Sequence, residues 1–360
     1  MDAVTLALFI AGLALLITGA EVLVRGAARL ARSLGISPLI IGLTVVAFCT
    51  SAPELAVGLQ ASLGGEADIA LGNVIGSNIF NILVILGLSA LVSPLVVHQR
   101  LIRLDVPLMI GLSVAVYLMA LDGRVSRVDG LLLVLGAIAY NIFAVRASRN
   151  TQPEVQQEYE NEFGAGRQSS RVVDLILIVG GLLMLVLGAR WLVAGAVALA
   201  RVLGLSELII GLTIIAVGTS LPEAATSVIA SLRGERDIAV GNAVGSNLFN
   251  LLLVLGVCSL ASAQGIAVPT AALRFDLPVM LAVAFVCLPI FFSGYRIARW
   301  EGALLFGYYI AYTIYLVLDA VGHDALPIFS AVMLLFVVPL TIITLAVVIV
   351  RQPRRELRTG

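Results

Sequence analysis

Apolar residues run along this chain in long stretches that short polar turns separate. A helix that crosses a membrane needs about 20 mostly apolar residues, and eleven stretches of the sequence meet that length. They predict helices near residues 3–31, 37–62, 68–93, 102–121, 126–146, 172–202, 206–231, 237–262, 273–293, 297–320 and 325–350. The hydrophobic pattern therefore predicts an all-α, multi-pass membrane protein.

The composition of the 360 residues excludes several other classes of protein. Hydrophobic residues make up 60% of the chain and charged residues 12%, against about 45–50% and about 25% in soluble domains. The formal net charge is +0, so no overall field attracts nucleic acid. A soluble enzyme, a disordered protein and a nucleic-acid-binding protein are therefore excluded. The expected surroundings are a lipid bilayer, and the sequence points to no protein partner.

The placement of arginine predicts how the chain crosses the membrane. Cytoplasmic loops carry an excess of basic residues. If the N-terminus lies outside, most of the arginines fall on the cytoplasmic side, including those of the tail from Arg351 to Arg358. We therefore expect a plasma (inner) membrane protein whose N-terminus is outside and whose C-terminus is cytoplasmic.

The segment 42–87 is repeated as the segment 211–256. The offset is 169 without a gap, and 27 of 46 positions are identical. Chance similarity between apolar helices would keep Leu, Val and Ala, whereas here the polar and special residues are kept. These pairs are Thr50/Thr219, Ser51/Ser220, Pro53/Pro222, Glu54/Glu223, Asn73/Asn242, Ser77/Ser246 and Asn81/Asn250. The chain therefore carries a duplicated unit.

Five predicted helices separate the two copies, so the second copy enters the membrane upside down. Inverted repeats place a binding site near the midplane, between interrupted helices. We expect a first five-helix repeat in residues 1–147, a cytoplasmic linker in 148–170 and a second, inverted five-helix repeat in 171–321. An eleventh helix and a basic cytoplasmic tail fill residues 322–360.

A motif that should break a helix occurs once in each copy. It reads GLTVVAFCTSAPE at residues 42–54 and GLTIIAVGTSLPE at residues 211–223. Proline has no N–H and clashes with the preceding turn, so carbonyls about four residues back, near residues 47–49 and 216–218, should be freed. A carbonyl freed at membrane depth must be satisfied by protein, water or an ion. Hydroxyl side chains stand beside each break.

Glu54 and Glu223 follow the two breaks directly. An ionised carboxylate at the bilayer centre costs at least about 2–3 kcal/mol, and two of them together would also repel each other. A cation answers both problems, and the donors nearby are the oxygens that hard cations such as Ca²⁺ prefer. A protonated glutamate that is hydrogen-bonded inside the bundle is the structural alternative.

A second motif follows, GNVIGSNIFN at residues 72–81 and GNAVGSNLFN at residues 241–250. Asn73, Ser77 and Asn81 are spaced by four, so they form one polar stripe on an apolar helix. The second copy repeats this stripe. These side chains either bind ions or hydrogen-bond to neighbouring helices, and the spacing alone leaves both interpretations open.

The two ordered, duplicated motifs resemble the α-repeats of sodium/calcium exchangers in the cation/Ca²⁺ antiporter superfamily. The resemblance implies the exchanger fold, an inverted repeat of two five-helix halves, here with an extra C-terminal helix. It also implies that Glu54 and Glu223 ligate Ca²⁺ and Na⁺. The further ion contacts that it implies come from Thr50, Ser51, Ser77, Thr219, Ser220, Ser246 and the carbonyls of Ala47 and Ala216, with Asn81 and Asn250 as the remaining central polar pair.

The sequence departs from the family pattern at two positions. Cys49 stands where the motif usually has glycine, and Asn250 stands where some relatives carry aspartate. With asparagine at both central positions, the site has two carboxylates, which one Ca²⁺ balances. Three Na⁺ bound together would leave the site with a net positive charge, so the sequence leaves the coupling ion open between Na⁺, H⁺ and Na⁺ with K⁺. The serines Ser77 and Ser246 favour Na⁺, because proton-coupled relatives often carry Glu-His in the second motif.

The resulting hypothesis is a secondary antiporter, not an enzyme, that exchanges Ca²⁺ for Na⁺ by alternating access. Ca²⁺ and Na⁺ are transported ions, and no organic cofactor is implied. The long helices 3–31 and 172–202 would slide or rock against the remaining bundle. A Ca²⁺/H⁺ antiporter, a K⁺-dependent Na⁺/Ca²⁺ antiporter and a passive cation channel are the alternatives. An intramembrane hydrolase would leave the serines, the asparagines and the inverted repeat unexplained.

Overall fold

The computed structural model describes residues 3–34, 37–65, 67–149, 171–202, 216–292 and 294–351. Within these ranges, nine helices are long and apolar enough to cross a membrane, and a bent pair, Pro38–Thr50 and Ala52–Gly64, forms a broken span with a 43° bend. These ten match ten of the eleven predicted helices. The remaining one, predicted at 206–231, is described only from Ala216 onward. The all-α, multi-pass prediction is confirmed for the described residues.

The chain up to residue 149 contains two short strands and a series of helices, several of which include a π-helical segment. The α-helices are α1 (Ala3–Leu34), α2 (Pro38–Ile41), α3 (Ala47–Thr50), α4 (Ala52–Gly64), α5 (Ala67–Phe80), α6 (Gly87–Val92), α7 (Val106–Met119) and α8 (Arg127–Arg149). The π-helical segments are η1 (Gly42–Val46), η2 (Asn81–Leu86) and η3 (Leu101–Asp105), the 3-10 turn is η4 (Ala120–Asp122), and the strands are β1 (Leu95–Val96) and β2 (Arg124–Val125).

The chain from residue 171 repeats this order and adds one helix. Its α-helices are α10 (Arg171–Val202), α12 (Ala216–Gly218), α13 (Leu221–Leu232), α14 (Arg236–Phe249), α15 (Leu255–Ala261), α16 (Leu277–Phe292), α17 (Arg299–Ala320), α18 (Leu326–Val332) and α19 (Val338–Arg351). The π-helical segments are η6 (Asn250–Val254), η7 (Ala272–Asp276) and η8 (Met333–Val337), and the strands are β3 (Ile266–Ala267) and β4 (Arg296–Ile297).

Two small antiparallel sheets show that the halves are inverted. β1 pairs with β4, and β2 pairs with β3. In the repeat, β3 corresponds to β1 and β4 corresponds to β2, so exchanging the two halves converts one sheet into the other. The strands β1 and β2 lie at opposite ends of the span Leu101–Asp122. Corresponding segments therefore lie at opposite ends of the bundle, and the predicted inverted repeat is confirmed.

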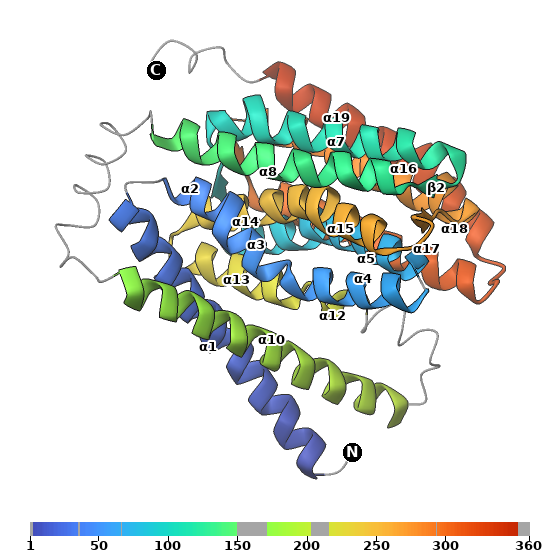
Figure 1. Cartoon of the computed structure of the whole chain (residues 1–360). Coiled ribbons are helices and arrows are strands. Elements are labelled where there is room, and N and C mark those ends of the chain that lie inside the picture. The colour runs from blue at the N-terminus through green and yellow to red at the C-terminus, as the bar shows by residue number, and fades with distance from the viewer. Residues whose placement is uncertain are drawn as a thin grey trace.

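The two long helices α1 and α10 pack against each other along one side of the bundle (Figure 1). Glycines line their crossing. A Cβ on Gly12 would come within 2.8 Å of the Gly188 carbonyl oxygen, and one on Gly19 would come within 2.9 Å of the Gly181 carbonyl oxygen. Small residues allow backbones to approach this closely in membranes. This seam holds α1 and α10 together as an antiparallel pair.

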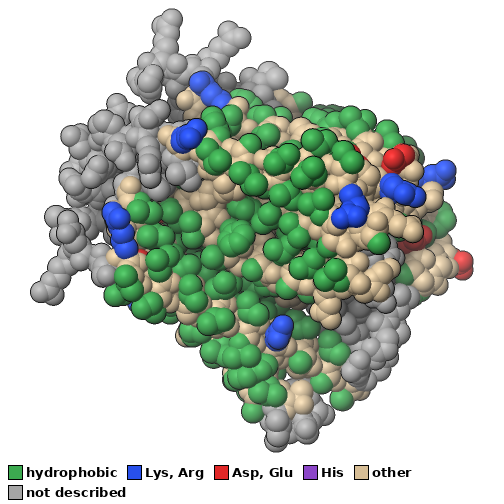
Figure 2. Space-filling view, viewed as in Figure 1, with side chains coloured by type: hydrophobic (Ala, Val, Ile, Leu, Met, Phe, Trp, Pro, Cys, Tyr) green, Lys and Arg blue, Asp and Glu red, His purple; other side chains and the backbone are tan. Residues whose placement is uncertain are grey.

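The helices that carry the second motif lie at the centre of the molecule. The spans Ile69–Val92 and Arg236–Ala261 are each 83% buried in their most apolar window, against 6% for Arg299–Ala320. Figure 2 shows an exterior dominated by hydrophobic side chains, with most of the charged ones toward two opposite ends. Such an apolar exterior suits contact with lipid. Of the linker predicted at 148–170, residues 150–170 lie outside the described residues, as does the tail from residue 352, and α8 includes positions 148 and 149.

Candidate cation site

Each proline motif breaks its helix one residue before the proline-containing turn begins. Ser51 has φ −81° and ψ 4° between α3 and α4, and Ser220 has φ −89° and ψ 5° between α12 and α13. Proline is tolerated in the first turn of the new helix, where its missing N–H has no partner to lose. The two breaks therefore place buried serines at matching points of the two repeats.

The glutamates lie on the first turns of α4 and α13 and are completely enclosed. Glu54 is 0% exposed and Glu223 is 1% exposed. The Ser51 hydroxyl donates to Glu223 Oε1 at 3.2 Å. The Ser220 hydroxyl donates to Glu54 Oε1 at 3.0 Å. Each carboxylate is thus bound by the serine at the opposite repeat's break, so the fold brings both acids and both breaks together.

The serines of the second motif lie in different surroundings. Ser77 Oγ is 2.9 Å from Ser220 Oγ and 3.5 Å from Glu54 Oε1. Ser246 is 0% exposed, and its hydroxyl has no hydrogen-bond partner among the described residues. The arrangement around Glu54 is therefore more tightly connected than the arrangement around Glu223.

Asn73 and Asn242 hold the breaks in place, a role that the sequence left undecided. The Asn73 side-chain amide donates to the Glu54 carbonyl at 3.3 Å, and its oxygen accepts from the Thr219 hydroxyl at 3.2 Å. Asn242 makes the mirrored contacts, to the Glu223 carbonyl at 3.3 Å and from Thr50 at 3.1 Å. Each asparagine links the glutamate of its own repeat to the threonine of the other. The exact duplication of Asn and Thr was the sequence signal for this pairing.

The threonine and alanine positions lie at the breaks but are already hydrogen-bonded in part. The Thr50 hydroxyl also lies 3.1 Å from the Val46 carbonyl oxygen. The Ala47 carbonyl accepts the Ser51 N–H at 3.0 Å, and the Thr50 hydroxyl lies 3.4 Å from the same oxygen. In the second repeat, the Ser220 N–H donates to the Val217 carbonyl. Ala216 begins α12 at the edge of the described segment.

Asn81 and Asn250 both begin π-helical segments in the middle of the central helices. Such segments are rare and are frequent at functional sites. The Asn81 amide donates to Asn247 Oδ1 at 2.9 Å. Asn250 is 1% exposed, and neither atom of its amide has a hydrogen-bond partner among the described residues. Both asparagines of the central pair are therefore buried, and among the described residues Asn81 has a hydrogen-bond partner whereas Asn250 has none.

Several buried oxygens of the site have no hydrogen-bond donor among the described residues. They are Glu54 Oε2, Glu223 Oε2, Asn81 Oδ1, Asn250 Oδ1 and Ser246 Oγ. Leaving a buried polar atom unsatisfied costs about 1–3 kcal/mol, and more for a charged group. Asn250 Nδ2 is the one further unpartnered atom of these five side chains among the described residues, so five of the six are oxygens, the donors that hard cations such as Ca²⁺ take in sets of about 6–8. The donor set fits a hard cation.

Among the residues that the structure describes, no cationic side chain lies within ion-pair distance of Glu54 or Glu223. The ion pairs found among the described residues join Arg25 and Arg233 to Glu21, His98 to Asp237, and Arg100 to Asp105. Among those residues, no group of three or more His, Cys, Asp or Glu side chains is placed to hold a metal. A soft transition metal therefore has no ligand set here, because such metals prefer thiolate and imidazole.

Comparisons with known proteins point to one family. A family model described as "Sodium/calcium exchanger protein" matches residues 4–146 and 173–318. The inner membrane protein YrbG of Escherichia coli (strain K12) is 41% identical over 282 residues, which are 78% of this chain and 86% of that protein. The sodium/calcium exchanger MaX1 of Methanosarcina acetivorans is 32% identical over 353 residues, which are 88% of this chain and 99% of that protein.

A solved structure has the same fold. The sodium-calcium exchanger NCX_Mj, soaked with 10 mM Na⁺ and zero Ca²⁺, matches with a TM-score of 0.74 and 32% sequence identity. The match covers 86% of this chain and 98% of that one. The family model covers both repeats, so the resemblance read from the two motifs is confirmed. The chain belongs to the sodium/calcium exchanger protein family.

Proposed function

We propose that this protein is a secondary antiporter that exchanges Ca²⁺ for Na⁺ across the membrane. The two enclosed carboxylates carry the proposal, because each is bound by the opposite repeat's serine and each keeps one oxygen without a donor. Membership of the exchanger family supports cation/Ca²⁺ antiport. The Na⁺ coupling rests on the neutral oxygen donors around the acids and on the names of the relatives.

The charge of the site explains why transport is exchange rather than leak. Glu54 and Glu223 carry two negative charges when ionised, and one Ca²⁺ neutralises both. Na⁺ ions compensate the same carboxylates at overlapping oxygen sites. An empty site would leave two like charges in a medium of low dielectric, which is costly. The protein therefore reorients with ions bound, and each direction of movement carries a cation.

The ligands that we propose come from both repeats. The carboxylates of Glu54 and Glu223 bind the ions directly. The hydroxyls of Thr50, Ser51, Ser77, Thr219, Ser220 and Ser246, the amide oxygens of Asn81 and Asn250, and the carbonyls of Ala47 and Ala216 complete the shell. Asn73 and Asn242 act as positioning residues, since their amides tie each glutamate to the opposite break.

Alternating access requires that the site open to one side at a time. We infer that the antiparallel pair α1 and α10 moves as a unit against the bundle, because their glycine seam joins them closely. With the arginine-rich side in the cytoplasm, the N-terminus lies outside. Each five-helix repeat, 1–147 and 171–321, then supplies one broken helix and one polar helix to the site. The linker 148–170 and the eleventh helix with its tail, 322–360, lie outside this transport unit.

The test is uptake of ⁴⁵Ca²⁺ into vesicles that contain the purified protein and are loaded with Na⁺. Uptake should require the outward Na⁺ gradient, and Glu54→Gln and Glu223→Gln should each abolish it. Asp319→Asn is a matched control, because it also removes one acidic charge but at an exposed position near the end of α17. Uptake in this variant should equal that of the unmodified protein.

Parallel arms of the same assay separate the alternatives. Uptake driven by a pH gradient without Na⁺ would replace Na⁺ with H⁺ as the coupling ion, and a strict need for K⁺ would add K⁺ to the cycle. Cation current without countertransport would show a channel. Full uptake in both glutamine variants would refute the proposed site, whichever ion drives transport.

A further inference from the structure

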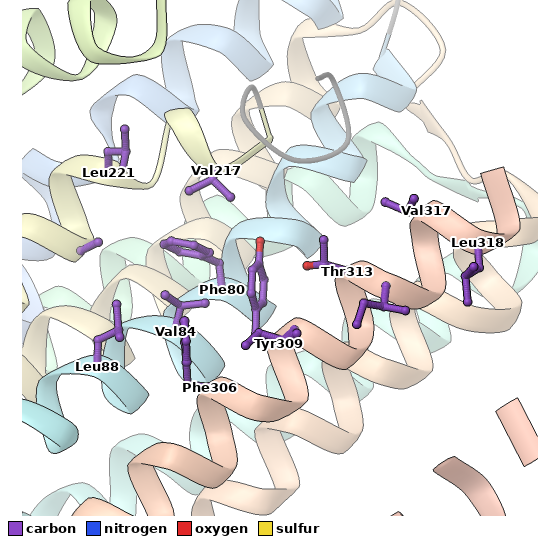
Figure 3. Close-up of a pocket in the computed structure, with 13 residues that line it drawn as sticks. Phe80, Val84, Leu88, Val217, Leu221, Phe306, Tyr309, Thr313, Val317 and Leu318 are labelled. Carbon is purple, nitrogen blue, oxygen red and sulfur yellow. The ribbon is translucent and has the colours of Figure 1, made fainter. Parts of the chain in front are cut away.

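A pocket of about 600 Å³ lies between three helices on one side of the cation site (Figure 3). One wall comes from the central span and includes Phe80 and Leu88. A second wall comes from the segment around the second helix break and includes Val217 and Leu221. The third wall is α17. Val217 and Leu221 flank Ser220, so the pocket lies directly behind one of the two breaks.

The described part of the lining is apolar almost throughout. Two of its described side chains carry a hydroxyl, Tyr309 and Thr313, and they lie one turn apart on α17. Ile310 and Ile314 also line the pocket and are 47% and 43% exposed. The most apolar window of α17 is only 6% buried. The pocket is therefore continuous with the apolar outer face of a membrane span.

The internal repeat relates two residues of this pocket to an aromatic pair in the other half. By the offset of 169, Val217 corresponds to Phe48, and Phe80 corresponds to Phe249. Phe48 and Phe249 pack edge to face with ring centroids 5.8 Å apart. Val217 has no aromatic ring that could pack on Phe80. The Phe80 ring packs instead on the ring of Tyr309 in α17, with centroids 5.4 Å apart. Phe48 thus occupies, in one half, the space that Val217 leaves open in the other.

The position of the pocket restricts what can occupy it. The eleventh helix reaches α17 at a different residue, since Tyr308 donates to Thr341 at 2.7 Å, and no described residue of 326–351 lines the pocket. A second transmembrane helix is about 10–12 Å across with its side chains, so it would have to force the three lining helices apart. A polar ligand would find few partners. A flexible hydrocarbon chain requires neither polar partners nor displaced helices.

We propose that this pocket binds one hydrocarbon chain of a membrane lipid, which enters from the bilayer between α13 and α17. The chain fills the volume that Val217 leaves and packs against Phe80 and Leu221. A chain bound there lies next to Ser220, which is about one helical turn along the sequence from Glu223. The site is independent of the identity of the transported ions.

The test uses the full-length protein in nanodiscs of phosphatidylcholine with a photoactivatable diazirine near the end of one acyl chain. After illumination, mass spectrometry locates the labelled peptides. We expect strong labelling of the pocket-lining parts of α13 and α17. Val217→Phe introduces the residue that the other repeat carries. The larger ring should remove the contacts of about two methylene groups of the lipid chain. That loss corresponds to roughly tenfold in a binding constant, so labelling of these peptides should fall about tenfold.

Two controls keep the result interpretable. Phe48→Val should open the corresponding space in the first half and create new labelling in the peptides of α4 and α8. Labelling of the outer face of α10 should not change in either variant, which also reports that the protein is folded. Equal labelling of the lining in Val217→Phe and the unmodified protein would overturn the proposal. Labelling of the lining no stronger than that of the exposed face of α10 would also overturn it.

Discussion

The unequal hydrogen bonding of the two site serines gives a prediction with a definite order. Ser220 binds Glu54 Oε1 at 3.0 Å and lies 2.9 Å from Ser77 Oγ. Ser51 makes one longer contact, 3.2 Å, to Glu223 Oε1. Replacing either serine by alanine removes a hydrogen bond to a charged group, worth about 1.5–3 kcal/mol. The Ser220 variant loses a second contact as well.

The magnitudes follow from these contacts. Ser51 and Ser220 are also proposed ion ligands, so the interaction that each variant loses is counted against the ion-bound state. One interaction of about 1.5 kcal/mol corresponds to roughly tenfold in a binding constant, so Ser51→Ala should weaken Ca²⁺ binding about tenfold. Ser220→Ala should weaken it by up to about a hundredfold, because the Ser77 contact, worth about 1 kcal/mol, is lost too. The double variant of Ser77 and Ser220 should be less harmful than the sum of the single variants, because the two hydroxyls share one interaction.

Calorimetric titration of Ca²⁺ into the purified protein in nanodiscs measures the affinity directly, and the half-saturating Ca²⁺ concentration of ⁴⁵Ca²⁺ uptake provides a second reading. Thermal unfolding without Ca²⁺ controls for damage to the fold. A larger effect of Ser51→Ala than of Ser220→Ala would refute the reasoning. So would strictly additive effects of Ser77→Ala and Ser220→Ala.

Three further predictions concern residues outside the ion ligands. Glu21→Gln breaks the ion pair that links α1 to Arg233, the residue after α13. Exposed ion pairs are worth about 0–1 kcal/mol, and salt screens them. The uptake rate should therefore change by up to roughly fivefold at low salt and should not change at high salt. Gly19→Leu places a Cβ 2.9 Å from the Gly181 carbonyl oxygen. It should lower the thermal midpoint of unfolding, since overpacking costs about 1–3 kcal/mol. Gly180→Leu should leave the midpoint unchanged, because no described atom lies within 4 Å of its Cβ. Asn242→Ala should lower stability by about 1–3 kcal/mol and more than Asn73→Ala, because Asn242 also donates to Ser227 at 2.9 Å; equal thermal shifts would contradict this.

The sequence by itself predicted the ten spans found among the described residues, the inverted repeat and the two acids that the fold encloses. Long apolar stretches form helices in lipid because the backbone must satisfy its own hydrogen bonds there. Pro53 and Pro222 break helices through their own missing N–H groups. These effects are local, so each can be read without knowing what the segment contacts. The duplication then supplied the inversion, since an odd number of spans separates the copies.

Tertiary structure alone decided which groups meet. Ser51 binds Glu223 rather than Glu54, although Glu54 is three residues away along the chain. Glu21 corresponds to Arg190 in the repeat, at the offset of 169, but it pairs with Arg25 and Arg233. Ser77 and Ser246 have the same motif and different neighbours. Residues some 170 positions apart come together only when the two halves pack, and sequence spacing carries no distance between them.

The same reason explains the lipid pocket. Phe48 and Val217 are both apolar residues before a helix break, and the hydrophobic pattern treats them as equal. Their difference in size matters because Phe249 packs on Phe48, whereas Phe80 and Val217 line the pocket from different helices. Pattern along the chain determines which side chains are buried, whereas the volume left between them depends on the shapes of neighbours that the fold brings together.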